Sequence, residues 1–353
     1  MTISRKTVIA AMMVLLTGAV VGEAGETTVG GTLFAHWKMD LTEAAGASEF
    51  GLSRAYVTVK SKLSERTSAR ITADLREADG FDGYSIVLKY GYLDWKPGFG
   101  KGVYRFRFGL QPTLYIDEMN KLWGRRYLMK TVGDLRGFLT TSDLGVGAML
   151  DLGEKGRAGH VALNIWNGTS YTDIEERNRR KDLSVFARFA PLRGRPDLER
   201  SAIQGQVYVG ALNVAPGEGE EISDYDHSLF SIGGLLAYRR TLDIGVDVNF
   251  YREGQGPGAD DLKQTGHSFF LTLYLSDLVA ADSPLRTLNF FGRVDMYDPD
   301  AYADDDGETT VVAGVECVPV SGFKASLNWR STSFQADDRD SAKFMYLNTL
   351  VAF

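Results

Sequence analysis

Positively charged side chains outnumber carboxylates in one long stretch of the chain, residues 113–141, which reads TLYIDEMNKLWGRRYLMKTVGDLRGFLTT. It carries the cations Lys121, Arg125, Arg126, Lys130 and Arg136, and the carboxylates Asp117, Glu118 and Asp134. Fixed charges around a water-filled passage select ions by sign. If this stretch lined such a passage, its excess of cations would give a mild preference for anions. The alternative is that the cations only form ion pairs with carboxylates of the same protein.

Side chains that catalyse reactions are scattered by comparison. The four histidines, His36, His160, His227 and His267, lie far apart, and neither an HExxH nor a GxSxG motif occurs. His160 and Asn164 share one face of an expected strand and could in principle orient a serine, which keeps an enzyme as a secondary interpretation. We predict no catalytic residues and no bound cofactor.

Metal ligands are also sparse. The only cysteine, Cys317, excludes an internal disulfide and a cysteine-cluster metal site. The acidic stretch DPDAYADDDGE, residues 298–308, offers oxygen ligands for divalent cations but lacks EF-hand spacing. A solvated acidic loop is the favoured interpretation, and we predict no metal site.

Composition narrows the class of protein. The formal net charge of −7 argues against a nucleic acid partner, which requires a clustered positive face. Glycine is abundant, with 39 residues, and proline is scarce, with 9, which favours strands joined by turns.

The first 24 residues have the order of a secretory signal peptide. Arg5 and Lys6 precede an apolar run from Val8 to Val21, and small residues around Ala24 suit cleavage. The run has about 14 residues, whereas a membrane-spanning helix needs about 20. We therefore expect a signal peptide over 1–24 and a mature domain over 25–353, with an uncleaved anchor as the alternative.

Strict alternation of apolar and polar residues dominates the rest of the chain. In GVYRFRFGLQPT, residues 102–113, a strand would place Tyr104, Phe106, Phe108 and Leu110 on one face and Arg105 and Arg107 on the other. An arginine facing lipid near the membrane midplane costs about 2–4 kcal/mol, so the rings should face lipid and the arginines water.

Sixteen such segments can be distinguished. They lie near 32–41, 50–61, 67–76, 84–96, 102–112, 142–152, 158–167, 182–190, 202–213, 228–239, 242–252, 266–276, 285–297, 308–318, 321–331 and 343–353. The segment 84–96 is the least clear because Lys89 fits neither phase, so fourteen or eighteen strands are also compatible. Short connections alternate with longer polar ones, although 191–201 and 277–284 are of middling length. This sorting predicts an all-β fold, a transmembrane antiparallel β-barrel in outer-membrane lipid.

Individual residues suit such a barrel. Trp37, Trp95, Tyr238 and Trp329 fall near expected strand ends, as interfacial aromatic residues do. Cys317 shares the apolar phase and is interpreted as a small hydrophobic residue that faces lipid. The chain ends on Phe353 in an amphipathic segment, which is typical of bacterial outer-membrane barrels.

The 113–141 stretch would be the third external loop of this barrel. A loop of this length is uncommon unless it is functional, and a sixteen-stranded barrel encloses a wide lumen. Folded inward, it would narrow the lumen, and its cations would join others on the neighbouring strands. The predicted pore-lining residues are Arg54, Arg70, Arg105, Arg107, Lys121, Arg125, Arg126, Lys130 and Arg136. The opposing interpretation pairs them with carboxylates such as Asp74, Asp94, Asp295 and Glu316.

Four stretches carry a family resemblance: SRAYVTVKSKL (53–63), YGYLDWKPGFGKGVYRFRFGLQPT (90–113), LNIWNGTSY (163–171) and KDLSVFARFAPL (181–192). Over about half of the chain they resemble the phosphate-selective porin O/P family of Gram-negative bacteria. The resemblance implies a sixteen-stranded barrel, usually a homotrimer, with the third loop in the lumen. The sequence lacks a repeated arginine ladder and long lysine-rich loops.

The expected function is therefore passive diffusion of small hydrophilic solutes or inorganic anions through a water-filled channel. One alternative is a channel selective for phosphate or another anion. Another, of a different class, is an outer-membrane barrel enzyme or a closed structural barrel.

Overall fold

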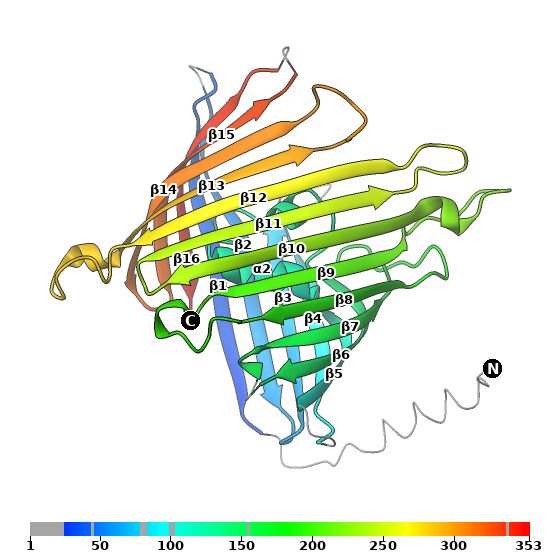
Figure 1. Cartoon of the computed structure of the whole chain (residues 1–353), viewed down its shortest axis with the longest axis horizontal. Helices are drawn as coiled ribbons and strands as arrows, with labels where there is room; N and C mark the ends of the chain where they lie inside the picture. The colour runs from blue at the N-terminus through cyan, green and yellow to red at the C-terminus, as the bar shows by residue number, and fades with distance from the viewer. Residues whose placement is uncertain (1–24, 44–45, 78–82, 99–102, 154–155, 337–338) are drawn as a thin grey trace.

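The computed structural model describes residues 25–43, 46–77, 83–98, 103–153, 156–336 and 339–353 (Figure 1). The described strands are β1 (Thr27–Asp40), β2 (Ser48–Lys62), β3 (Thr67–Glu77), β4 (Tyr84–Trp95), β5 (Val103–Pro112), β6 (Ser142–Leu152), β7 (Gly159–Trp166), β8 (Asp182–Phe189), β9 (Ala202–Ala211), β10 (Asp226–Tyr238), β11 (Leu242–Glu253), β12 (Leu262–Tyr274), β13 (Leu288–Asp298), β14 (Glu308–Val320), β15 (Phe323–Phe334) and β16 (Ala342–Ala352). Each strand pairs with its neighbours in the chain, and β1 pairs with β16 to close the barrel.

This closed antiparallel barrel confirms the predicted fold class and strand number. The largest boundary difference is in β1, which begins at residue 27 rather than 32 because its start pairs with the end of β2, Thr27 opposite Ser61. The expected signal peptide, residues 1–24, lies outside the described residues. No helix in the described part of the chain is long and apolar enough to cross a membrane.

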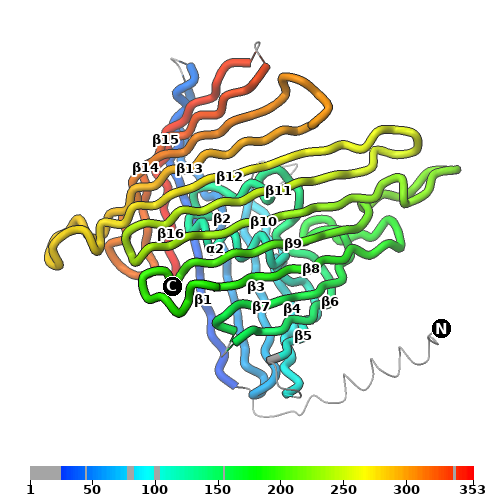
Figure 2. The backbone as a smooth tube through the Cα atoms, viewed as in Figure 1, coloured from blue at the N-terminus to red at the C-terminus, as the bar shows by residue number. Residues whose placement is uncertain are grey.

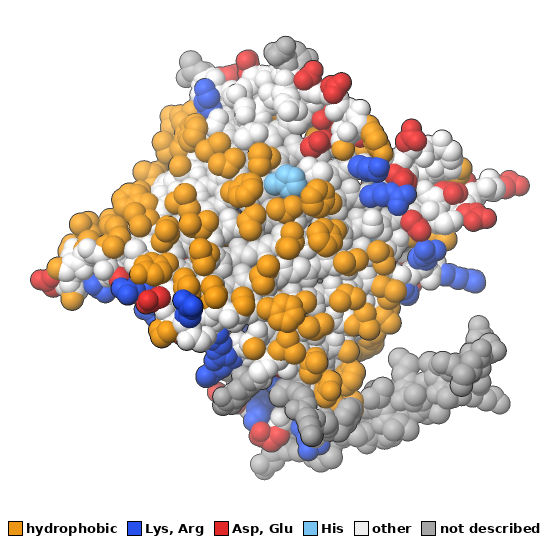
Figure 3. Space-filling view, viewed as in Figure 1, with side chains coloured by type: hydrophobic (Ala, Val, Ile, Leu, Met, Phe, Trp, Pro, Cys, Tyr) orange, Lys and Arg blue, Asp and Glu red, His pale blue; other side chains and the backbone are white. Residues whose placement is uncertain are grey.

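The outer face of the barrel is apolar. Phe106 and Phe108 are exposed there, while Arg105 and Arg107 point inward, as the alternation predicted. Figure 3 shows apolar side chains covering the middle of one outer face, with charged side chains gathered toward its ends. An apolar belt on a closed barrel is the surface that lipid solvates.

Leu110 departs from the prediction because it is buried. The alternation of the strand stops at Gly109, whose φ of 120° lies in a region that favours glycine. A Cβ at that position would lie 2.3 Å from the carbonyl oxygen of Gly91, so the two strands approach closely there. Leu110 is the last residue of β5 that pairs with β4, opposite Gly91, whereas β5 stays paired with β6 to Pro112 before the chain enters residues 113–141.

A β-bulge in β4 explains why Lys89 fits neither phase. Tyr90 pairs with Thr72 and Leu88 with Ala73, so Lys89 is the extra residue between two consecutive pairs. Lys89 and Tyr90 are both buried on the inner side, and the exposed positions resume in the opposite phase at Leu93. A bulge re-aims side chains in this way at the cost of one ladder position.

The connections are longer at one end of the barrel, which we call the loop end, than at the other, which we call the turn end. At the turn end, 239–241 and 321–322 are tight, but 190–201 and 275–287 are long and contain the 3-10 helices η2 (Pro196–Leu198) and η4 (Pro284–Thr287). The sorting of loops by length is therefore a tendency rather than a strict rule. At the loop end, 212–225 contains η3 (Ile222–Tyr225).

The longest connection, residues 113–141, folds into the barrel and is called the inner loop below. It contains α2 (Leu114–Trp123) and α3 (Val132–Leu135), and Figure 2 shows its trace enclosed by the strands. Its side chains supply much of the buried hydrophobic cluster, including Tyr115, Met119 and Trp123. The core of this barrel therefore lies in its lumen, around an inward-folded loop, as predicted.

Trp329 was expected near a strand end but lies in the middle of a strand. The reason is that β15 extends to Phe334, which pairs with Glu308 on β14. The terminal Phe353 lies beside β1, where its backbone N–H and C=O bond to Gly31. Cys317 follows the outward phase of β14 and is half-buried.

Candidate pore constriction

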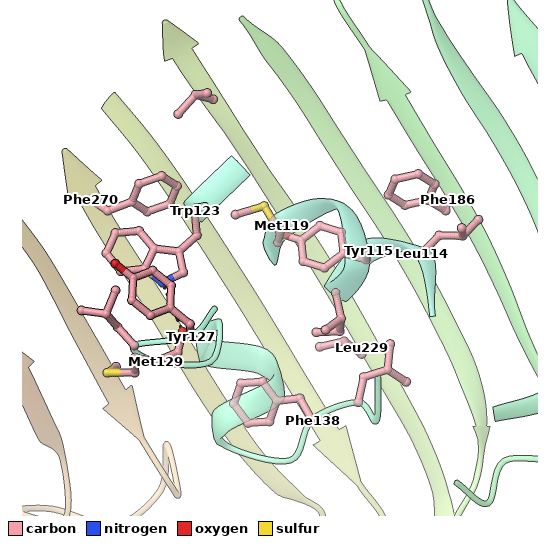
Figure 4. Close-up of a cluster of buried hydrophobic side chains, with 14 of the residues drawn as sticks. Leu114, Tyr115, Met119, Trp123, Tyr127, Met129, Phe138, Phe186, Leu229 and Phe270 are labelled. Carbon is pink, nitrogen blue, oxygen red and sulfur yellow. Dashed lines mark hydrogen bonds between the residues drawn. The ribbon is translucent and has the colours of Figure 1, made fainter. Parts of the chain in front are cut away.

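The apolar face of α2 packs against the inner surface of β9 to β11. The hydroxyl of Tyr115 donates a hydrogen bond of 2.8 Å to Asp247, and the amide of Gln204 bonds to the Tyr115 carbonyl at 3.3 Å. Met119 is fully buried and covers Gly233, where a Cβ would approach its sulfur to 2.6 Å. Figure 4 shows Tyr115 and Met119 turned toward the same stretch of wall.

A buried group of polar residues fixes the segment after α2. The guanidinium of Arg125 donates to Glu316 on β14 at 3.0 Å and to Thr272 on β12 at 2.7 Å. The hydroxyl of Tyr127 donates to the other oxygen of Glu316 at 2.9 Å, and Asn289 donates to the first. We call Arg125, Tyr127 and Glu316 the latch. Because burial and the neighbouring Glu316 raise the pKa of Tyr127, the hydroxyl remains a neutral donor.

Aromatic contacts secure the inner loop on both sides of the latch. The ring of Trp123 lies edge-on to Phe270 at 5.3 Å between centroids (Figure 4), and Phe138 stacks on Tyr251 at 5.4 Å. Aromatic pairs of this geometry contribute about 0.5–1.5 kcal/mol each beyond the area they bury. The inner loop is thus firmly packed against β9 to β14.

The opposite face of α2 is polar and borders a cavity. This cavity, about 190 Å³ in volume, lies between α2 and the inner surface of β1 to β4. Its lining includes Asp117 and Asn120 from α2 and Arg70 and Lys89 from the wall. We call the β1–β4 side of the lumen the open side, and the β9–β14 side the packed side.

Eight of the nine predicted pore-lining cations have a carboxylate within 4 Å. The pairs are Arg54–Asp74 (2.7 Å), Arg105–Asp151 (3.4 Å), Arg107–Asp94 (2.6 Å), Lys121–Glu118 (2.7 Å), Arg125–Glu316 (3.0 Å), Arg126–Asp134 (3.2 Å), Lys130–Asp134 (3.3 Å) and Arg136–Glu308 (2.7 Å). Arg70 has no such partner among the described residues; it contacts Thr72 and the ring of Tyr90. Of the wall carboxylates named as partners, Asp295 pairs instead with Arg293.

These residues do not form one ring. Arg54, Arg70 and Arg126 meet on the open side, whereas Arg125 is buried in the latch. Arg105 and Arg107 line a smaller space beside Leu114. Arg136 lies at the other end of the inner loop, where it binds Glu308 on β14.

In most of these pairs the cation is the more exposed partner. The side chain of Lys130 is 36% exposed and that of Asp134 6%, while Arg54 is 13% exposed and Asp74 fully buried. Lys121 is the most exposed cation of the inner loop, at 59%. Exposure is nearly equal in Arg107–Asp94 and Arg136–Glu308. In five of the eight pairs solvent therefore reaches the cation more readily than its carboxylate partner.

The charge of Lys121 is secured by its neighbours. Burial lowers the pKa of Lys121, but Asp117 and Glu118, both within 3 Å, more than offset this and raise it above its ordinary value. The ammonium therefore stays protonated well above neutral pH.

Lys89 and its surroundings were not among the predicted site residues. Its ammonium lies over the rings of Tyr171, Tyr56 and Tyr90, at 4.7, 5.5 and 5.7 Å from their centroids, and donates to Thr141 at 2.8 Å. The signal that could have found it is its failure to fit either phase of β4. A charged residue that breaks the alternation marks a bulge aimed at the lumen.

The arrangement of His160 does not support a catalytic role. Asn164 does contact a serine, Ser184 on β8, at 3.4 Å. His160 lies four residues before Asn164 on β7, where the residue opposite it on β8 is Arg188. Four residues of strand separate His160 from that serine by about 13 Å. Within the described part of the chain, no group of three or more His, Cys, Asp or Glu side chains is placed to hold a metal ion.

No protein-family model matches the sequence, and no curated protein matches it. Solved structures do match its fold. The trimer form of in-vitro folded OmpT, an outer membrane protein of Vibrio cholerae, has a TM-score of 0.63 and 15% identity, covering 94% of this chain and 100% of that one.

Two channels match over a similar span. The outer membrane channel DcaP of Acinetobacter baumannii has a TM-score of 0.63 and 11% identity, covering 95% of this chain and 99% of that one. An anion-selective porin from Comamonas acidovorans has a TM-score of 0.61 and 10% identity, covering 93% and 99%. At these identities the likeness shows the fold alone, which is that of outer-membrane porins.

Proposed function

We propose that this protein is an outer-membrane porin through which small hydrophilic solutes and inorganic anions diffuse passively, with a mild preference for anions. The observation that carries the proposal is the charge arrangement of the narrowed lumen. The inner loop is packed against one wall, and the ion pairs around the remaining space expose their cations more than their carboxylates. A positive surface in a confined aqueous space concentrates anions and repels cations.

The permeation path in this proposal runs on the open side, between α2 and β1 to β4. Hydrogen bonds, ion pairs and ring contacts there hold the side chains in place, so they narrow the path without filling it. The paired carboxylates limit the net field, and the preference for anions is mild for that reason. Nothing in the path forms or breaks covalent bonds in the solute.

Further parts of the proposal concern the setting of the channel. The apolar outer belt makes outer-membrane lipid the surrounding medium, with residues 1–24 as the secretory signal and the loop end outside the cell. A homotrimer is proposed from the family resemblance and from the trimer form of OmpT, which has the same fold. Membership of the phosphate-selective porin O/P family is proposed on the same sequence resemblance.

Reversal potentials in planar bilayers test this function. The mature chain is reconstituted, and the current is recorded with a KCl gradient across the membrane. We expect steady ohmic current and a reversal potential whose sign corresponds to a permeability to chloride moderately above that to potassium. Preference for potassium would overturn the anion selectivity.

The same recordings separate the alternatives. Absence of current from correctly folded protein would support a closed structural barrel and overturn the porin proposal. Chloride current blocked by micromolar inorganic phosphate would support a phosphate-selective channel instead of a general one. A heat-modifiable band in gel electrophoresis provides the check that the barrel has folded.

A further inference from the structure

The α2 cavity on the open side brings three cations together. Arg70 from β3, Lys89 from β4 and Arg126 from the inner loop all line its 190 Å³. The carboxylate of Asp117 also lines it, but Lys121 already binds that group at 2.8 Å. The cavity is therefore electropositive on three sides.

Two of these three cations have no carboxylate partner among the described residues. Within the described part of the chain, Arg70 contacts Thr72 at 3.0 Å and the ring of Tyr90, and Lys89 donates to Thr141 and lies over three tyrosine rings. Lys89 is also 6% exposed, so its charge is largely withdrawn from water. A buried charge without a counter-ion is unfavourable and is relieved when an anion approaches.

The remaining lining is partly apolar and aromatic. The side chains of Phe34, Tyr56, Tyr90 and Ile116 face the same space. A hydrated inorganic oxyanion gains nothing from such surfaces, whereas the carbon frame of an organic anion buries apolar area against them. The side-chain oxygen of Asn120, also in the lining, has no hydrogen-bond partner in the described part of the chain.

From this combination we infer that the α2 cavity is a binding site for a small organic monocarboxylate, which contacts Arg70 and Lys89 through its carboxylate and the aromatic wall through its carbons. The inference rests on the proposed porin function and assigns it a solute class. A volume of 190 Å³ holds about six water molecules, which sets the size of the solute.

The test compares three probes in single-channel recordings of the wild-type protein in KCl. Butyrate carries both a charge and a carbon frame, butyramide has the frame alone, and inorganic phosphate has charge alone. We expect butyrate to reduce the chloride current reversibly at concentrations where the other two have little effect. Equal block by butyramide, or stronger block by phosphate, would overturn the inference.

Variants locate the site. We expect Arg70→Met and Lys89→Met each to weaken the block by butyrate about tenfold, as loss of one charge-assisted contact does. The matched control is Lys62→Met, since Lys62 is an exposed cation at the end of β2 and lies outside this cavity; block by butyrate should stay within about twofold of wild type. Block unchanged by Arg70→Met would contradict the site.

Folding and function are separated within the same experiment. Lys89 is buried, so if Lys89→Met fails to form a barrel, Arg70→Met, at a partly exposed position, decides the outcome alone. Ohmic current without any block by butyrate would overturn this inference and leave the porin function intact. Absence of current in the wild type would overturn the porin function itself.

Discussion

The packed and open sides of the lumen use similar residue types in opposite ways. On the packed side, Arg125 is buried with Glu316 and forms part of a continuous apolar and hydrogen-bonded contact between the inner loop and β9 to β14. On the open side, Arg70 has no carboxylate partner among the described residues and borders a cavity. Arg125 therefore anchors the inner loop, whereas Arg70 faces the proposed solute path. The difference between them is whether a carboxylate is paired with the guanidinium.

The largest expected effect comes from breaking the latch. Glu316→Gln leaves Arg125 buried without its carboxylate, which costs about 3–5 kcal/mol for a buried pair. We expect lower stability of the inner loop, increased single-channel conductance and more current noise. Urea unfolding followed by tryptophan fluorescence measures the stability.

The matched control for the latch is Glu49→Gln, because Glu49 forms an exposed pair with Lys38. Pairs of that kind contribute about 0–1 kcal/mol, so the control should behave like wild type. If Glu316→Gln left both stability and conductance unchanged, the packed side would not be held by the latch.

A smaller effect is expected from adding one methyl group beneath α2. Gly233→Ala would place its Cβ 2.6 Å from the sulfur of Met119 and 2.9 Å from the hydroxyl of Tyr115, so these buried side chains of α2 must move. Overpacking of this kind costs about 1–3 kcal/mol. The same unfolding measurement checks it. Gly292→Ala, whose nearest neighbour is 3.9 Å away, should be tolerated, and equal effects of the two variants would argue against close packing of α2.

The smallest change in stability is expected at Lys121, on α2. Its ion pairs are partly exposed, so Lys121→Met should alter stability by about 1 kcal/mol or less. The ratio of chloride to potassium permeability should nevertheless fall. In the wild type this contribution persists as pH rises through neutrality and is lost only at alkaline pH, because the pKa of Lys121 is raised.

Reversal potentials measured at several pH values check the Lys121 prediction. Lys263→Met serves as the control, since Lys263 is an exposed cation at the loop end of β12, away from the lumen. A permeability ratio that changes as much in the control as in Lys121→Met would mean that Lys121 does not set the preference.

The barrel was predictable because one physical rule governs most of the chain. Every strand separates lipid from the interior, so alternation alone assigned Phe108 outward and Arg107 inward. The inward position of the inner loop followed from its length, from the wide lumen of a sixteen-stranded barrel and from the family resemblance. Alternation failed at the Lys89 bulge, where the strand pairing is irregular, and at Leu110, which follows the positive φ of Gly109.

The partners of the lumen charges could not be predicted in the same way. Arg125 and Glu316 are separated by 191 positions, and their contact depends on how the inner loop crosses the lumen. Arg54 and Asp74 lie on neighbouring strands, so alternation gave their shared face, but the contact depends on register. That Arg70 has no carboxylate partner in the described part of the chain could be seen only once the carboxylates of the lumen had been placed.

The proposed channel requires that water pass along the open side of the lumen and not along the packed side. Single cysteines at Thr58, on the wall of the α2 cavity, and at Ser231, buried beneath the inner loop, are introduced in a Cys317→Ser background. A charged thiol-specific methanethiosulfonate reagent is then added during single-channel recording. We expect a stepwise fall in conductance for Thr58→Cys and none for Ser231→Cys. Rapid modification of Ser231→Cys with no effect at Thr58→Cys would contradict the account.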